Sequence, residues 1–137
     1  MFRQPLAVLA VLMIATAPPV RADDPPVDCS KAMATHELNF CAEQELNSAD
    51  AKLNDAYQKV LAFIAKSDAE KPYDAKSWQA ALRESQRAWV AFRDADCKGL
   101  VPMSWTGGTG TTGEVLGCMT SKTKDRTKDL IELYELD

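Results

Sequence analysis

The residues of this chain that could take part in chemistry are four cysteines, a lone histidine and a glycine-rich run. The cysteines are Cys29, Cys41, Cys97 and Cys118, and no two of them form a CxxC pair. Four cysteines in a small exported protein are typical of two disulfides, and oxidised cysteines supply neither a nucleophile nor a metal ligand. His36 has no second histidine with which to share a zinc ion, so we interpret it as a solvent-facing residue.

The run from Gly108 to Gly113 (GTGTTG) has the GxGxxG spelling of dinucleotide-binding folds. In those folds a strand precedes the glycines and a parallel sheet surrounds them, whereas no segment of this chain alternates like a strand. Glu114 also stands where a phosphate-binding loop needs a lysine. The run therefore predicts a flexible connector, and we expect no nucleotide, other cofactor or metal.

Charged residues of the segment 82–97 could be catalytic or could form ion pairs. Arg93 and Asp94 are adjacent, so we expect them to point to different sides of a helix. A cross-helix ion pair, for instance between Arg93 and Asp50, is the more ordinary role for charges in such a segment. Because no Ser/His/Asp or Cys/His set can be assembled, the sequence does not predict an enzyme.

Three predicted helices, over 35–66, 75–96 and 114–136, must position these residues. On one side of each, apolar residues recur at helical spacing. The predicted inward-facing residues include Ala42, Leu46, Ala49, Leu53, Ala56, Val60 and Phe63 in the first helix, Trp78, Leu82, Ser85, Trp89 and Phe92 in the second, and Leu116, Met119, Thr123, Leu130, Leu133 and Tyr134 in the third. A loop over 98–112 joins the second helix to the third. The pattern indicates an all-α fold, a small disulfide-stapled antiparallel three-helix bundle, in a single domain over 29–134.

The positions of the cysteines favour one disulfide pairing. Cys97 ends the second predicted helix and Cys118 lies in the first turns of the third, so a bridge between them would close the loop. Cys29 and Cys41 would lie roughly 18 Å apart on one continuous helix, which is too far for a bridge. They can meet if the segment before the first helix folds back over it. We favour the pairs 29–41 and 97–118, and the two crossed pairings stay open.

Residues 1–22 have the features of a secretory signal peptide. These features are Arg3, the apolar run Leu6–Ala15 and small residues before a cleavage site after Ala22. The run is shorter than the roughly 20 residues that cross a bilayer, so we expect no stable membrane anchor after cleavage. Residues 23–34 then form a polar leader, and the expected location is the periplasm or the exterior of the cell.

The mature chain is expected to be acidic. Without Arg3 and Arg21 it keeps 14 of the 16 basic side chains against 20 acidic ones, a net charge of −6. An acidic surface repels phosphate backbones, which excludes nucleic acid as a partner. The charge would speed the encounter with a basic protein, although its simpler role is to keep a small exported domain soluble.

Trp105 lies among small polar residues in the predicted loop. A tryptophan in a disulfide-closed loop can anchor a protein partner, because its large area is ordered at low entropic cost. It can equally cover the end of the bundle. The candidate partner-binding residues in and beside this loop are Trp105, Thr109 and Glu114.

Motifs on all three predicted helices resemble the LprI-type lysozyme inhibitor family, and the resemblance covers nearly all of residues 29–134. The matching positions are Asp50, Leu53, Asn54 and Tyr57 in the first helix, Gln86, Arg87, Trp89, Arg93, Asp94 and Cys97 in the second, and Cys118, Arg126, Leu130 and Tyr134 in the third. Most of these residues lie on the inward-facing side (the seam) of a predicted helix, form a disulfide or are placed to contact a neighbouring helix. We therefore expect them to have structural roles.

The resemblance implies a small secreted or envelope-located helical protein that binds lysozyme and blocks the cleavage of peptidoglycan. Such an inhibitor would occlude the sugar-binding cleft of a basic lysozyme with its carboxylates and the Trp105 loop. The alternative is a periplasmic interaction module whose partner is another envelope protein.

Overall fold

A computed structural model of the chain describes residues 27–136. The elements are α1 (Thr35–Ile64), α2 (Ala75–Asp94), α3 (Val101–Trp105) and α4 (Thr111–Leu133), with a π-helical turn, η1 (Ala95–Leu100), between α2 and α3. No strand occurs within residues 27–136, so the predicted all-α class is confirmed. The predicted signal peptide, residues 1–22, lies outside the described residues.

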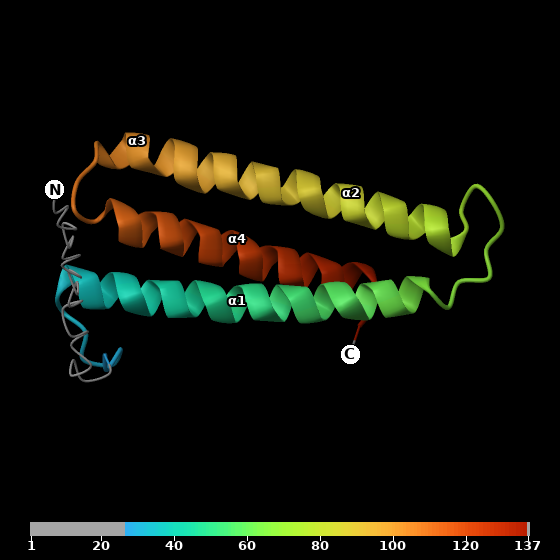
Figure 1. Cartoon of the computed structure of the whole chain (residues 1–137), viewed down its shortest axis with the longest axis horizontal. Coiled ribbons are helices and arrows are strands. Elements are labelled where there is room, and N and C mark those ends of the chain that lie inside the picture. The colour runs from blue at the N-terminus through green and yellow to red at the C-terminus, as the bar shows by residue number, and fades with distance from the viewer. Residues whose placement is uncertain (1–26, 137) are drawn as a thin grey trace, which may run out of the picture.

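The long helices lie side by side along the length of the molecule (Figure 1). The chain runs along α1, turns back along α2, η1 and α3, and then follows α4 in the direction of α1. The most extensive contacts between elements are those of α1 with α4. None of the helices in the described part combines the length and the apolar character needed to cross a membrane.

The segment between the second and third long helices is mostly helical, so the prediction of a loop over 98–112 is wrong. The helix of α2 continues through η1 and α3 as far as Trp105. Pro102 does not break it: this proline directly follows the π-helical turn, at the beginning of α3. This continuous helix ends at Thr106 and Gly107, which both have a positive φ (49° and 74°). Residues 106–110 then form a short connector between α3 and α4.

Side-chain hydrogen bonds mark where α1 and α2 begin. The Glu37 carboxylate accepts hydrogen bonds from the backbone N–H groups of Met33 and Ala34, both at 3.1 Å. These two bonds hold the pKa of Glu37 below its ordinary value, which keeps a negative charge at the positive end of the helix dipole. At α2, Asp74 is the N-cap and accepts from the Ser77 N–H at 3.1 Å. Hydrogen bonding by the Ser77 side chain first, and then by its N–H, holds the pKa of Asp74 below its ordinary value.

Two groups of buried side chains form the core. The larger one, toward the α1–α2 turn, consists of Leu53, Ala56, Val60, Ile64, Leu82 and Leu130. The smaller one, toward the α3–α4 connector, consists of Leu46, Cys97 and Met119. Most of the buried apolar residues of α1 lie on the predicted seam, so the helical spacing identifies that face correctly.

Four residues that were predicted to face inward are exposed: Phe63, Ser85, Phe92 and Leu133. The predicted seam of α1 follows a 3.5-residue repeat, whereas an α-helix has about 3.6 residues per turn, so the inward face drifts by about 20° per heptad. By the end of α1 this drift places Ile64 in the core and Phe63 beside it. In α2 the inward position is taken by Arg93 rather than Phe92. Leu133 lies in the last turn of α4.

Both disulfides have the favoured pairing. Cys29 bridges Cys41 and Cys97 bridges Cys118, each with a Cα–Cα distance of 5.6 Å. The first bridge ties the segment before α1 to its second turn. The second joins η1 to α4 from within the smaller core group, where Cys97 is fully buried. The second bridge thereby closes a loop of the chain that contains α3 and the α3–α4 connector.

Candidate functional site

One buried arginine joins the three long helices. Arg93 of α2 is only 9% exposed, and its Nη1 donates to Asp50 Oδ1 of α1 at 3.0 Å and to Thr123 Oγ1 of α4 at 3.0 Å. The guanidinium carbon also lies 5.1 Å from the centroid of the Trp89 ring, within range of a cation–π contact. The predicted ion pair between Arg93 and Asp50 is thus confirmed, and it is part of a wider network.

Arg93 and Asp94 differ in exposure, as expected of adjacent helical residues, yet their side chains are hydrogen-bonded to each other. Arg93 Nε donates to Asp94 Oδ1 at 3.2 Å, because the long arginine side chain folds back toward its neighbour. Asp94 also accepts from Lys98 Nζ at 2.7 Å. The hydrogen bond from Lys98 and, after it, that from Arg93 hold the pKa of Asp94 below its ordinary value. Both residues therefore belong to one charged network at the end of α2.

Other motif residues link α4 to α2. Arg126 donates to Gln86 Oε1 at 3.2 Å and to Ser85 Oγ at 3.1 Å. Trp78 Nε1 donates to the hydroxyl of Tyr134 at 3.3 Å. These contacts join helices rather than present groups to a ligand.

The three candidate partner-binding residues lie at one end of the molecule. Trp105 ends α3, Thr109 lies in the connector, and Glu114 stands in the first turn of α4; all three are exposed. Figure 1 shows that α3, the connector and the first turn of α4 lie at the end where α1 begins. We call this region, with the first turns of α1 and the segment before them, the loop end.

The loop end carries exposed apolar side chains that the seam analysis did not identify. They are Met33, Leu38 and Phe40 at the start of α1, and Leu100, Met103 and Trp105 in and next to α3. Met33 is 87% exposed and Met103 is 76% exposed. Apolar side chains gathered at one place on a surface mark an interaction site. Leu100 and Met103 were overlooked because they were placed in a loop, where apolar residues have no periodic face to reveal them.

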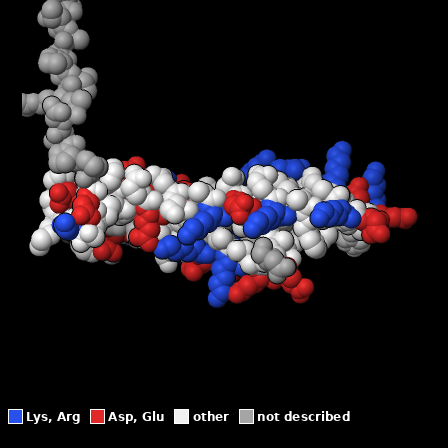
Figure 2. Space-filling view, turned by 90° about the horizontal axis from the view of Figure 1, so that it is seen from below, with Lys and Arg blue, Asp and Glu red and all other residues white. Residues whose placement is uncertain are grey.

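Carboxylates lie at the same end of the molecule as these apolar residues. Figure 2 shows Asp and Glu side chains gathered at the end of the molecule where α1 begins, whereas Lys and Arg dominate the rest of that face. The acidic residues of the loop end are Asp28, Glu37, Glu43, Glu45 and Glu114. Glu45 is paired with Lys124 and Asp28 with Lys31, while Glu43 and Glu114 form no ion pair within residues 27–136. The loop end is therefore both apolar and acidic.

The ring of Trp105 lies against the connector. A Cβ atom built on Gly110 would stand 2.7 Å from Cζ3 of the ring, closer than such contacts allow. Trp105 as a whole residue is nevertheless 42% exposed, so part of it remains open to a partner. Gly110 is needed for this close approach, not for an unusual φ, which is −78°.

We expect Gly110→Ala to displace the Trp105 ring, because the new methyl group and the ring cannot occupy the same space. Gly117→Ala is the matched control: a Cβ there meets nothing within 4 Å, and replacing a glycine inside α4 should raise the free energy of unfolding by up to about 1 kcal/mol. The measurement is the NMR shift of the Trp105 indole N–H, together with urea unfolding. An unmoved indole signal in Gly110→Ala would contradict the packing described.

No group of three or more His, Cys, Asp or Glu residues in the described part is arranged to hold a metal ion. His36 is exposed in the first turn of α1, beside Glu37.

Comparison with known proteins gives one family and two relatives. Residues 28–130 match the model of a family described as lysozyme inhibitor LprI. The chain is 39% identical over 130 residues to an uncharacterized protein of Rhizobium meliloti (strain 1021), with 93% of this chain and 92% of the relative covered. It is 34% identical over 103 residues to the uncharacterized protein YecT of Escherichia coli (strain K12), with 71% of this chain and 62% of YecT covered. No solved structure matches.

Proposed function

The chain belongs to the LprI lysozyme inhibitor family, and we propose that it binds a basic lysozyme through the loop end and covers the substrate cleft of that enzyme. The observation that carries the proposal is that exposed apolar side chains and carboxylates (the latter visible in Figure 2) lie at the same end of the molecule. In this proposal residues 1–22 are a signal peptide, 29–134 form one antiparallel helical bundle, and the protein works in the periplasm or outside the cell.

The charges and the apolar residues of the loop end have separate parts in the proposed binding. Glu43 and Glu114 attract a cationic surface and raise the association rate at low salt. Met103 and the exposed part of Trp105 lose contact with water when the partner is seated, which slows dissociation. The two disulfides hold these segments in place beforehand, so little conformational entropy is lost on binding.

The direct test is inhibition of muramidase activity on cell walls by the mature protein at low salt. Chicken-type, goose-type and invertebrate-type lysozymes are each assayed, and we expect stoichiometric inhibition of at least one of them. We expect Glu43→Lys/Glu114→Lys to weaken that inhibition roughly tenfold or more, because two attractive charges become repulsive.

The matched control is Glu70→Lys/Asp129→Lys, which makes the same change in net charge away from the loop end. Its inhibition constant should stay close to that of the unmodified protein. Equal losses in the two double variants would show that net charge, not the loop end, matters. If no lysozyme is inhibited but one other envelope protein is retained, and Trp105→Ala releases it, the alternative of a general interaction module is favoured.

A further inference from the structure

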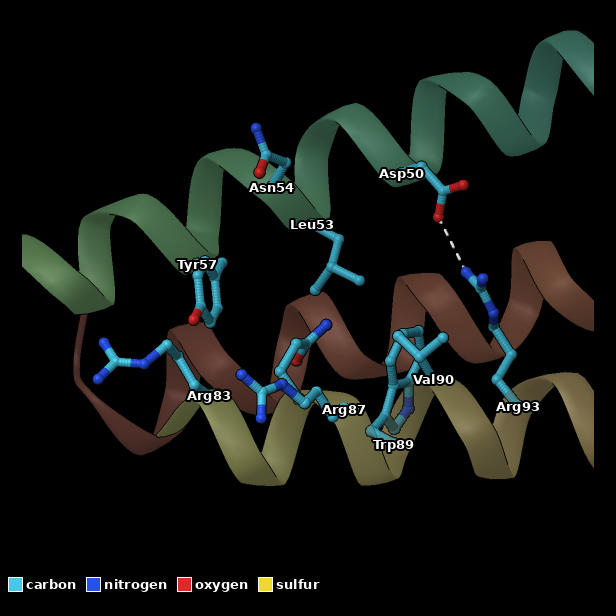
Figure 3. Close-up of a pocket in the computed structure, with 10 residues that line it drawn as sticks. Asp50, Leu53, Asn54, Tyr57, Arg83, Arg87, Trp89, Val90 and Arg93 are labelled. Carbon is cyan, nitrogen blue, oxygen red and sulfur yellow. Dashed lines mark hydrogen bonds and ion pairs between the residues drawn. The ribbon is translucent and has the colours of Figure 1, made fainter. Parts of the chain in front are cut away.

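An open groove runs between α1 and α2, on a part of the surface that the proposed lysozyme contact does not use. Its volume is about 570 Å³. Figure 3 shows its walls: Asn54 and Tyr57 come from α1, Arg83, Arg87 and Trp89 from α2, and the Arg93–Asp50 ion pair lies at one end. Direct contacts between α1 and α2 are few compared with those between α1 and α4, which explains why a groove remains here.

The groove is cationic in an acidic protein. Its lining contains three arginines and a single carboxylate, Asp50, while the whole chain has a net charge of −4. Asp50 is already bound by Arg93. Arg87 has one neighbouring carboxylate, that of Glu84 at 3.4 Å, but both side chains are about three-quarters exposed, so this pair is weak. Arg83 and Arg87 are thus available to an anionic ligand.

The rest of the lining offers flat apolar surface and amide groups. Tyr57 and Trp89 are partly buried aromatic residues on opposite walls, and Leu53 lies between them on the α1 side. Asn54 and Gln86 also line the groove, and the Gln86 amide, whose oxygen accepts from Arg126, keeps its N–H groups for a ligand. Nearly all the polar groups of the lining are hydrogen-bond donors or amides. Its one carboxylate, that of Asp50, is already paired with Arg93.

We propose that this groove binds an acidic oligosaccharide, that is, a short chain of sugar rings that carry carboxylates. Arginine forms bidentate hydrogen bonds with carboxylates, which suits Arg83 and Arg87. The apolar faces of sugar rings fit against Tyr57 and Trp89, and their hydroxyls accept and donate hydrogen bonds with the amides. An acidic peptide fits less well, because its backbone N–H groups need acceptors and this lining supplies mainly donors.

The test uses tetragalacturonate, whose four sugar rings each carry a carboxylate, with calorimetry and NMR shifts of the mature protein at low salt. Cellotetraose, a neutral tetrasaccharide, and tetraglutamate, an acidic peptide, are measured in parallel. We expect binding of tetragalacturonate that weakens as salt is added, with shifts at Trp89 and Tyr57, no measurable binding of cellotetraose, and weaker binding of tetraglutamate.

Two double variants make the test specific. Arg83→Gln/Arg87→Gln should weaken tetragalacturonate binding about tenfold or more, since hydrogen bonds to a charged group are lost. Lys59→Gln/Lys128→Gln removes the same charge from surfaces outside the groove and should have little effect. All four side chains are exposed, so circular dichroism should show intact helices.

Three results would overturn the proposal: no binding of tetragalacturonate, equal binding of cellotetraose, or equal or tighter binding of tetraglutamate. The last would assign the groove to acidic peptides. The proposal is also separable from lysozyme inhibition, because Arg83→Gln/Arg87→Gln leaves the loop end unchanged and should leave inhibition unchanged.

Discussion

Cys97→Ala/Cys118→Ala is expected to lower the free energy of unfolding by roughly 3–4 kcal/mol, the largest loss among the variants considered for this protein. The bridge spans 21 residues, and releasing a loop of that length returns roughly 3 kcal/mol of chain entropy to the unfolded state. Cys97 is also fully buried against Leu46 and Met119, so its replacement leaves a small void. Urea unfolding followed by circular dichroism measures the loss.

The other disulfide provides the control. Cys29→Ala/Cys41→Ala opens a shorter span of 12 residues, and Cys29 is exposed. The segment before α1 can then separate from the helix without disturbing either core group, because local opening is not global unfolding. We expect less than half the loss seen for the other pair. Equal losses would mean that the smaller core group contributes little to stability.

The second large effect concerns the ion pair of Arg93 and Asp50. Either Arg93→Met or Asp50→Ala should cost roughly 2–3 kcal/mol, since each leaves charged or polar groups at the centre of the helices without a partner. Asp50 remains 46% exposed, so water moderates the cost of its removal or isolation. The double variant should lose less than the sum of the single losses, by about 1–2 kcal/mol.

The pair formed by Lys124 and Glu45 is the matched control for this double-mutant cycle. Its atoms are closer, at 2.6 Å against 3.0 Å, but both side chains are more than half exposed. We expect the coupling free energy to depend on burial rather than on distance. The control cycle should therefore give a coupling free energy of less than about 1 kcal/mol. A stronger coupling in the exposed pair would contradict this account of the central network.

The features that sequence analysis predicted correctly depend on short-range geometry. The second helix starts at Ala75, as predicted, and the structure shows Asp74 as its N-cap. The pairing of Cys97 with Cys118 follows from two cysteines on either side of one connector. The Arg93–Asp50 contact was predictable because both residues fall near the seams of neighbouring helices.

The errors arise where a local signal was given too much weight. The second helix was predicted to end at residue 96 and a loop was predicted over 98–112, although Pro102 lies within a helical segment, α3. The exposed apolar residues Leu38, Phe40 and Met103 were not identified, because helical spacing reveals the inward-facing side of a helix and gives no sign of apolar side chains outside it. The groove between α1 and α2 was not predicted. Its width depends on the distance between the two helices, and no local sequence pattern specifies that distance.

The π-helical turn η1 sets the angular phase of everything that follows it. A π turn is equivalent to one residue inserted into an α-helix, so it rotates the downstream side chains by about 100° around the axis. Cys97 keeps its place in the core, while Leu100 and Met103 are turned to the outside. Insertion or deletion of a single residue within this turn would therefore change which side chains of α3 are exposed at the loop end. The disulfides and the buried core groups would remain intact.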